Sequence, residues 1–494
     1  MRKKLPIFYS ALMLTGVNLL LRFVGTSFQV YLSTRIGAAG IGLLQLVMSV
    51  GGLAMVAGIA GIRTATMYLA AEELGRKKPQ NIVWVLSGCF LYSICFSSFV
   101  AALLYHFAPW IASVWIGDVR TVDALRLFAS FLPVTCLCGV MTGYFTASNR
   151  IGTLAAVEVA EQFCSMGLTL GALVVFAGDD PVRATMCVIL GSSSGCILTL
   201  VCLIILRLRE QAPVGPQIMI SSRLAQTALP LAVADDLKSG ISTVENLMVP
   251  KRLALNTTVS SPLSAFGLVS GMVFPVIMFP AAILFGLTEL LVPELARCTA
   301  AGTERRIHYL VRTALRVALV YGTVTGGLLC LLSDSLCMQL YGNLDASSQM
   351  QAYALLVPLL YCDIITDAMT KGLGQQKICV RYNIFTSVLD VAFLYFLLPR
   401  YGMQGYFLSF LVTHLINFIL SLRRLLQITI HSIPAYIPLL SAAAMIFSVW
   451  AAGFVPNTSV RCGAYLTLLG AQLVLLGVLH REDVSWVKGL LYKK

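Results

Sequence analysis

The residues of this sequence that could do chemistry are charged side chains that interrupt long apolar stretches. Arg22 lies in the middle of the run NLLLRFVGTSFQ, and Asn18 precedes it by four residues, about one helical turn. A charged side chain at the centre of a membrane helix costs about 2.5–3.5 kcal/mol on insertion scales, so Arg22 is expected to face a partner or a polar cavity. Two interpretations stay open. Arg22 is either half of a structural ion pair inside a helix bundle or an anion-binding group in a water-filled cavity.

The most polar of the apolar stretches covers residues 224–248. Asp235, Lys238 and Ser242 recur there at helical spacing on one face, and Glu245 follows three residues later. In one interpretation Asp235 and Lys238 simply neutralise each other. In the other, this helix lines a solvated cavity and offers both charges to a ligand.

The stretch 263–291 contains prolines at intervals that would break a helix. Pro275 and Pro280 each remove a backbone donor, and Gly271 adds a flexible position. Broken helices suit the alternating access of transporters, so we expect a hinge here. Static kinks in a passive bundle are the alternative.

Three further ionisable residues are candidates for ligand or ion binding. Arg63 follows a glycine-rich stretch near the expected inner leaflet, where it either captures an anionic head group or extends its side chain to the membrane surface. Asp363 and Asp367 are one helical turn apart and form a possible cation or proton site. Buried acids paired with a neighbouring helix are the competing interpretation.

The 14 cysteines have no metal-ligand spacing, so neither a metal site nor a disulfide is expected.

The elements that must position these residues are membrane-spanning helices. Of the 494 residues, 58% are hydrophobic and only 12% are charged, and the mean hydropathy is +0.85. Lipid must be the solvent for much of such a chain. About 20 mainly apolar residues cross a membrane. Applying that length predicts an all-α protein with fourteen spans: 7–32, 41–69, 82–104, 124–147, 151–177, 183–206, 224–248, 263–291, 308–332, 351–372, 379–398, 405–422, 434–455 and 460–480.

The basic residues predict the orientation. With the N-terminus in the cytoplasm, 23 of the 35 Lys and Arg residues fall in cytoplasmic segments and 7 in external ones. This bias predicts that both termini are cytoplasmic. The net charge of +13 is therefore topological, and no nucleic-acid partner is expected.

Weak similarities between spans six helices apart, such as the Pro133 and Pro358 helices, indicate two parallel repeats. We therefore divide the chain into a first lobe at 1–210, a second at 211–430, and two further helices with a tail at 431–494. No phosphate-binding loop or hydrolase motif is present, so no enzyme activity, cofactor or ATP-driven step is expected.

Several segments resemble the stage V sporulation protein B family within the multidrug/oligosaccharidyl-lipid/polysaccharide exporter superfamily, to which the lipid II flippases are related. They are LRFVGTSFQVYLSTRIGAAGIGLLQL, VAEQFCSMGLTLGALVVF, TALPLAVADDLKSGISTVENLMVPKRL, FGLVSGMVFPVIMFPAAILFGLTELLVPELAR, YCDIITDAMTKGLGQQK and LPRYGMQGYFLSF. They occur in the expected order over nearly the whole chain.

The resemblance implies two six-helix lobes around a central cavity, with two extra helices, in a multi-pass plasma membrane protein of a bacterium. It implies a monomeric flippase that moves a lipid-linked saccharide, such as a polysaccharide or peptidoglycan precursor, to the outer leaflet and works beside cell-envelope synthesis enzymes. Arg22 matches an arginine that related flippases use to hold the diphosphate. The cation those proteins carry in their eighth helix has no counterpart here before Arg297, and Lys238 is the candidate substitute.

Two other functions stay open. A cation-coupled antiporter of drugs or small molecules, driven by H⁺ or Na⁺, belongs to the same superfamily. A membrane-bound glycan transferase is the third class, although no catalytic loop is apparent.

Overall fold

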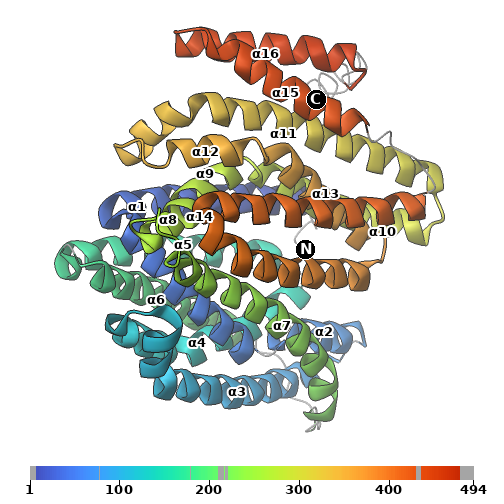
Figure 1. Cartoon of the computed structure of the whole chain (residues 1–494). Coiled ribbons are helices and arrows are strands. Elements are labelled where there is room, and N and C mark those ends of the chain that lie inside the picture. The colour runs from blue at the N-terminus through green and yellow to red at the C-terminus, as the bar shows by residue number, and fades with distance from the viewer. Residues whose placement is uncertain are drawn as a thin grey trace. The chain divides into compact units, whose positions relative to one another are not determined.

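Every regular element in the part of the chain that the structure describes is a helix, as the sequence predicts. The computed structural model describes residues 7–59, 61–76, 78–148, 150–178, 180–209, 216, 221–429 and 436–478 (Figure 1). The α-helices are α1 (Ile7–Ile59), α2 (Ile62–Gly75), α3 (Ile82–Trp110), α4 (Val122–Ala147), α5 (Ile151–Ala172), α6 (Pro181–Leu208), α7 (Ser221–Leu253), α8 (Pro262–Gly267), α9 (Phe274–Met278), α10 (Ala282–Ala300), α11 (Glu304–Tyr341), α12 (Ser347–Ala354), α13 (Val357–Gly372), α14 (Gln376–Thr429), α15 (Tyr436–Gly453) and α16 (Thr458–Leu475). Short helical turns of other types are η1 (Pro79–Asn81), η2 (Ile111–Ile116), η3 (Val119–Thr121), η4 (Leu173–Ala177) and η5 (Leu268–Val273).

Two of these helices are interrupted by a single glycine. α1 has 53 residues and α14 has 54, lengths of about 80 Å against a hydrocarbon core of about 30 Å. The backbone leaves the helical region at Gly37 (φ 72°) and at Gly402 (φ 56°), where a side chain would be strained. Each long helix is therefore two consecutive spans joined at one residue.

Within the described residues, seven helical stretches are long and apolar enough to cross a membrane, and nine if each bent pair counts as one span. Division at Gly37 and Gly402 adds two more. α7 is too polar for that test because of its charged residues, and α15 and α16 are short. With these three included, the helical segments match the fourteen predicted spans.

The first compact unit contains residues 1–28 and 35–267. Its core lies among α2, α3, α4 and α6, where Leu69, Leu86, Phe145 and Leu203 pack together. Small residues allow the close approach, since a Cβ atom at Gly143 would lie 2.5 Å from the carbonyl oxygen of Arg63. α7 packs against α2, α3 and α8 and so belongs to this unit. The repeat boundary at residue 210 is a different division and stays a prediction.

The second compact unit contains residues 29–34 and 268–494. In it, α11 packs against α12, α13, α15 and α16, and α13 packs against α10 and α14. Tyr353, Tyr361 and Tyr465 are its largest fully buried side chains. The extra helices α15 and α16 are attached to this unit through α11, with the Tyr465 hydroxyl 2.7 Å from the carbonyl oxygen of Thr323.

The predicted proline-containing span is broken. Its two parts, Pro262–Met278 and Ala282–Thr299, meet at an angle of 59° beside Pro280. The Gly271 position is part of the π-helical turn η5, and Pro275 begins the short helix α9. The kink is therefore present where the prolines predict it, whereas movement about it stays a prediction.

Tyrosine hydroxyls from neighbouring helices bind the carbonyl groups along this break. Tyr341 donates to Met272 O at 2.8 Å, and Tyr361 donates to Ile277 O at 2.9 Å. Tyr321 donates to Pro280 O, also at 2.9 Å. Backbone carbonyls in a membrane interior need a partner inside the protein, and these hydroxyls supply it where the helix geometry is disturbed.

Candidate functional site

The first compact unit contains a cavity of about 480 Å³ between the second half of α1 and α7. The α1 side is mostly apolar and small, and the α7 side is polar. Its lining residues are Met48, Ser49, Gly52, Val56, Ile59, Gly61, Asp235, Lys238, Ser239, Ser242, Thr243 and Asn246. This volume is within the range of about 300–1,000 Å³ that is typical of small-molecule sites.

Helical periodicity explains why α7 presents these groups together. Asp235, Ser239, Ser242 and Asn246 follow one another at intervals of three or four residues, so they share one face. Lys238 lies on the same side, three residues after Asp235. The polar face predicted from the sequence therefore lines the cavity, as far as Asp235, Lys238 and Ser242 are concerned.

Two hydrogen bonds fix α7 against α1 at one end of this cavity. Asn246 Nδ2 donates to Ser49 Oγ at 3.0 Å, and Thr243 Oγ1 lies 3.1 Å from Ser49 O. Ser49 and Asn246 were not singled out in the sequence. Their signal was present, because a serine and an asparagine inside apolar helices usually find partners across helices.

The cavity contains one negative and one positive side chain, and both are exposed to it. No ion pair within 4 Å joins Asp235 or Lys238 to another group in the part of the chain that the structure describes. This arrangement leaves each charge available to a ligand. It does not favour the interpretation in which the two only neutralise each other.

The other predicted site residues of this unit lie outside the cavity lining. Arg22 is exposed on the first half of α1, and Arg63 is exposed on the first turn of α2, two residues after Gly61. The side chain of Asn18 is outside the described residues. Glu245 is half-buried on α7 and is not among the lining residues. A joint anion subsite of Arg22 and Lys238 therefore stays a prediction.

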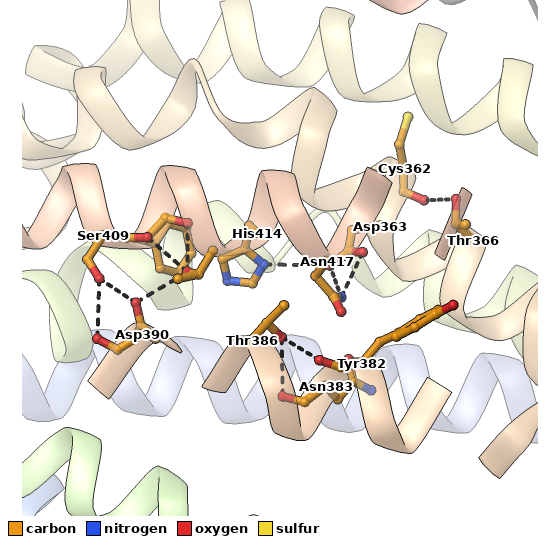
Figure 2. A network of polar contacts seen from close by, with 12 residues as sticks. Cys362, Asp363, Thr366, Tyr382, Asn383, Thr386, Asp390, Ser409, His414 and Asn417 are labelled. Carbon is orange, nitrogen blue, oxygen red and sulfur yellow. Dashed lines mark hydrogen bonds and ion pairs between the residues drawn. The ribbon is translucent and has the colours of Figure 1, made fainter. Parts of the chain in front are cut away.

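A second polar cluster lies in the other compact unit, between α13 and α14, and Figure 2 shows it from close by. Asn417 Nδ2 donates to both carboxylate oxygens of Asp363, at 3.0 and 3.2 Å. His414 Nδ1 lies 3.6 Å from Asp363 Oδ2. Asp363 and Asn417 are buried, so a carboxylate, an amide and an imidazole meet inside the unit.

Asp363 and Asp367, one turn apart on α13, have different partners. Asp367 lies 2.5 Å from Lys371, one turn further along α13, and this pair is partly exposed. A joint ion site of Asp363 and Asp367 stays a prediction. A further acid of this unit, Asp390, is buried in α14. Ser409 Oγ lies 2.6 Å and Thr413 Oγ1 3.2 Å from Asp390 Oδ1. Figure 2 shows Ser409 beside Asp390.

The cluster of Asp363, Asn417 and His414 also contains an oxygen that could accept a further hydrogen bond. The Asn417 side-chain carbonyl oxygen is buried and has no hydrogen-bond partner among the described residues. A buried acceptor without a donor, in the same cluster as a buried carboxylate, suits a proton or a small cation. No group of three or more metal-binding side chains was found among the described residues.

Comparison with known proteins gives consistent relatives. The MatE family model matches residues 14–174. Stage V sporulation protein B of Bacillus subtilis (strain 168) is 21% identical over 406 residues, which cover 80% of this chain and 78% of that protein.

Two solved structures are similar along most of the chain. One, the lipid II flippase MurJ in an inward closed conformation, has a TM-score of 0.67 at 12% identity, and the match covers 96% of this chain and 99% of that one. Another, an inward-facing multidrug resistance MATE family transporter of the MOP superfamily, has a TM-score of 0.66 at 13% identity. This match covers 86% of this chain and 100% of that one. The resemblance expected from the sequence is thus confirmed: this chain is similar to stage V sporulation protein B, and its fold is similar to that of the MOP-superfamily transporters.

Proposed function

We propose that this chain is a membrane transporter that moves a lipid-linked saccharide from the inner to the outer leaflet by alternating access. The observation that carries the proposal is the cavity between α1 and α7, which offers two charges, three hydroxyls and an amide from one face of an otherwise membrane-spanning helix. A saccharide diphosphate cannot cross about 30 Å of hydrocarbon unaided. The similarity to a lipid II flippase and to stage V sporulation protein B supports the same class of substrate.

The diphosphate would be held by basic side chains. Lys238 supplies a positive charge inside the cavity. Arg22 and Arg63 are the further contacts we expect, with Arg63 near the cytoplasmic entry, because guanidinium groups suit bidentate phosphate binding. Asp235 opposes anion binding at its end of the cavity, so the sugar hydroxyls are the ligand groups that it would accept.

A cation-coupled antiporter of drugs or small molecules is the second candidate. Asp235, exposed in the same cavity, would attract a cationic ligand, and a multidrug MATE transporter has the same fold. In either case the energy would come from an ion gradient, from the membrane potential or from downstream consumption of the substrate. If H⁺ or Na⁺ is coupled, the candidate site is Asp363 with Asn417 and His414, together with Asp367 one turn away on α13.

The cellular setting belongs to the same proposal. The protein would be a monomer in the bacterial plasma membrane with both termini in the cytoplasm, and it would act beside enzymes of cell-envelope synthesis. The boundary at 210 would separate the two lobes whose relative movement opens the cavity to each side, and the boundary at 430 would separate the second lobe from the last two helices.

Reconstituted liposomes test the proposal against its alternative. Purified protein is incorporated into vesicles with a fluorescent polyprenyl-diphosphate saccharide, and dithionite bleaching of the outer leaflet reports flipping. We expect faster loss of the protected signal than in vesicles without protein, and no uptake of a cationic dye under an imposed H⁺ or Na⁺ gradient. Dye uptake without flipping would replace the flippase by the antiporter.

A further inference from the structure

The first turns of α11 carry a line of basic and aromatic side chains on one exposed face. Arg305, Tyr309 and Arg312 are spaced by four and three residues, so they lie above one another along the helix. All three are exposed, and Tyr309 is exposed to 58%. Arg316 continues the line and is half-buried.

The opposite face of the same segment is apolar and packed. Val311, Ala314, Leu315 and Ala318 are buried within the second compact unit. The segment is therefore amphipathic, with its position fixed by the unit and its basic face turned outward. A helix of this composition is typical of the boundary between head groups and acyl chains.

The length of α11 places this face at the membrane surface. The helix has 38 residues and is about 57 Å long, whereas the hydrocarbon core is about 30 Å thick. Residues 317–341 are mainly apolar and fill that thickness, so the segment 304–316 extends beyond it. Tyrosine prefers the head-group level, which agrees with the exposed Tyr309.

The acidic side chains near this face interact with other arginines and not with Arg305 or Arg312. Glu294 of α10 lies 2.6 Å from Arg306 and 3.7 Å from Arg297, so it interacts with two arginines that are off the line. Glu304 precedes Arg305 by one residue and points about 100° away around the helix. No ion pair of Arg305 or Arg312 is present among the described residues.

From these observations we infer that the face formed by Arg305, Tyr309 and Arg312 binds the phosphate of an anionic phospholipid in the surrounding leaflet. The arginines contact the head group, and Tyr309 packs at the level of the glycerol and the upper acyl chain. This surface is distinct from the transport cavity, and the inference does not depend on which substrate is carried. It predicts a lipid requirement that belongs to the second unit alone.

Native mass spectrometry of the purified full chain tests the inference. The protein is titrated with phosphatidylglycerol and, separately, with phosphatidylcholine of the same acyl chains. We expect tighter binding of the first phosphatidylglycerol molecule. The double variant Arg305→Gln/Arg312→Gln should weaken that binding roughly thirtyfold, about fivefold for each arginine, and leave phosphatidylcholine binding unchanged.

The matched control removes two exposed arginines elsewhere. Arg120 and Arg183 are exposed to 67% and 69% and each lies near an aspartate. Arg120→Gln/Arg183→Gln should bind phosphatidylglycerol like the unchanged protein. Arg305→Lys/Arg312→Lys should retain most of the binding, because it keeps both positive charges. If the double glutamine variant fails to fold, Arg305→Gln and Arg312→Gln are measured singly, and each should weaken the binding about fivefold.

Three results would overturn the inference. They are unchanged phosphatidylglycerol affinity in the folded glutamine variants, an equal loss in the control double variant, or complete displacement of the lipid by millimolar inorganic phosphate. The last result would indicate a site for free phosphate and not for a lipid.

Discussion

Lys238 is the residue on which the proposed anion site depends most directly. Replacing it with glutamine keeps a polar side chain of similar length in the cavity and removes the positive charge. We expect flipping of the diphosphate lipid to fall at least tenfold, because the anion would lose a charge-assisted contact in a low-dielectric wall. The liposome assay measures this, with protein folding checked by size-exclusion chromatography.

The control for Lys238 is Lys78→Gln, an exposed position after α2 that is outside the cavity lining. It should transport normally. Asp235→Asn separates the two interpretations of the charged pair. If Lys238→Gln is inactive only through misfolding and Asp235→Asn rescues it, Lys238 is structural and the anion site is wrong.

Asn417 stabilises the buried carboxylate of Asp363, so removing the Asn417 amide should lower the stability of the folded protein. In Asn417→Ala, Asp363 loses both amide hydrogen bonds. We expect the free energy of unfolding to fall by about 1–3 kcal/mol. Thermal unfolding in detergent reports it. Asn383→Ala is the control in the same helix, because the contact of Asn383 with Thr386 uses its backbone carbonyl. An equal fall in the free energy of unfolding in both variants would show that the hydrogen bonds from Asn417 to Asp363 do not stabilise the protein.

Tyrosine hydroxyls satisfy three of the backbone carbonyls along the broken span. Tyr361→Phe keeps the ring in place and leaves the Ile277 carbonyl without its donor. The expected cost is about 1–3 kcal/mol, seen as a lower midpoint of thermal unfolding. Tyr401→Phe, at a position exposed to 58%, is the matched control and should melt like the unchanged protein. An unchanged midpoint for Tyr361→Phe would mean that water satisfies this carbonyl.

The topology prediction concerns the whole molecule. Single cysteines are introduced at Lys78, in a connection expected inside, and at Leu255, in a connection expected outside; both positions are exposed. A membrane-impermeant maleimide should label Leu255→Cys in intact cells and Lys78→Cys only after permeabilisation. The native cysteines provide the background, which is measured in the unchanged protein. The reverse pattern would invert the orientation.

Hydropathy and charge were sufficient for the scaffold of this molecule. The spans, the all-α fold and the kink at Pro280 follow from local composition, since a membrane allows few backbone conformations. Helix ends were less accurate: the span predicted at 308–332 is α11, Glu304–Tyr341, because its amphipathic start is too polar to resemble a span.

The pairing of functional residues needed the structure. Asp363 accepts hydrogen bonds from Asn417, 54 residues away, and spacing within one helix does not predict that contact. Helical spacing correctly grouped Asp235, Lys238 and Ser242, because those residues share one helix face. It could not reveal Ser49, whose contact with Asn246 spans 197 residues. A single sequence contains periodicity within helices, whereas contacts between helices are set by packing.

The single-residue breaks at Gly37 and Gly402 also limit how this protein can be cut or extended. Each break passes from one span to the next without an intervening loop, in a conformation that few residues other than glycine adopt. A protease needs several extended residues to bind a chain, and an inserted epitope tag needs a connection that can lengthen. Neither condition is met at these two places. The connection at 254–261, which is largely exposed and has no regular helix, is a place where tags and cleavage sites can be introduced on the outer side of the proposed topology.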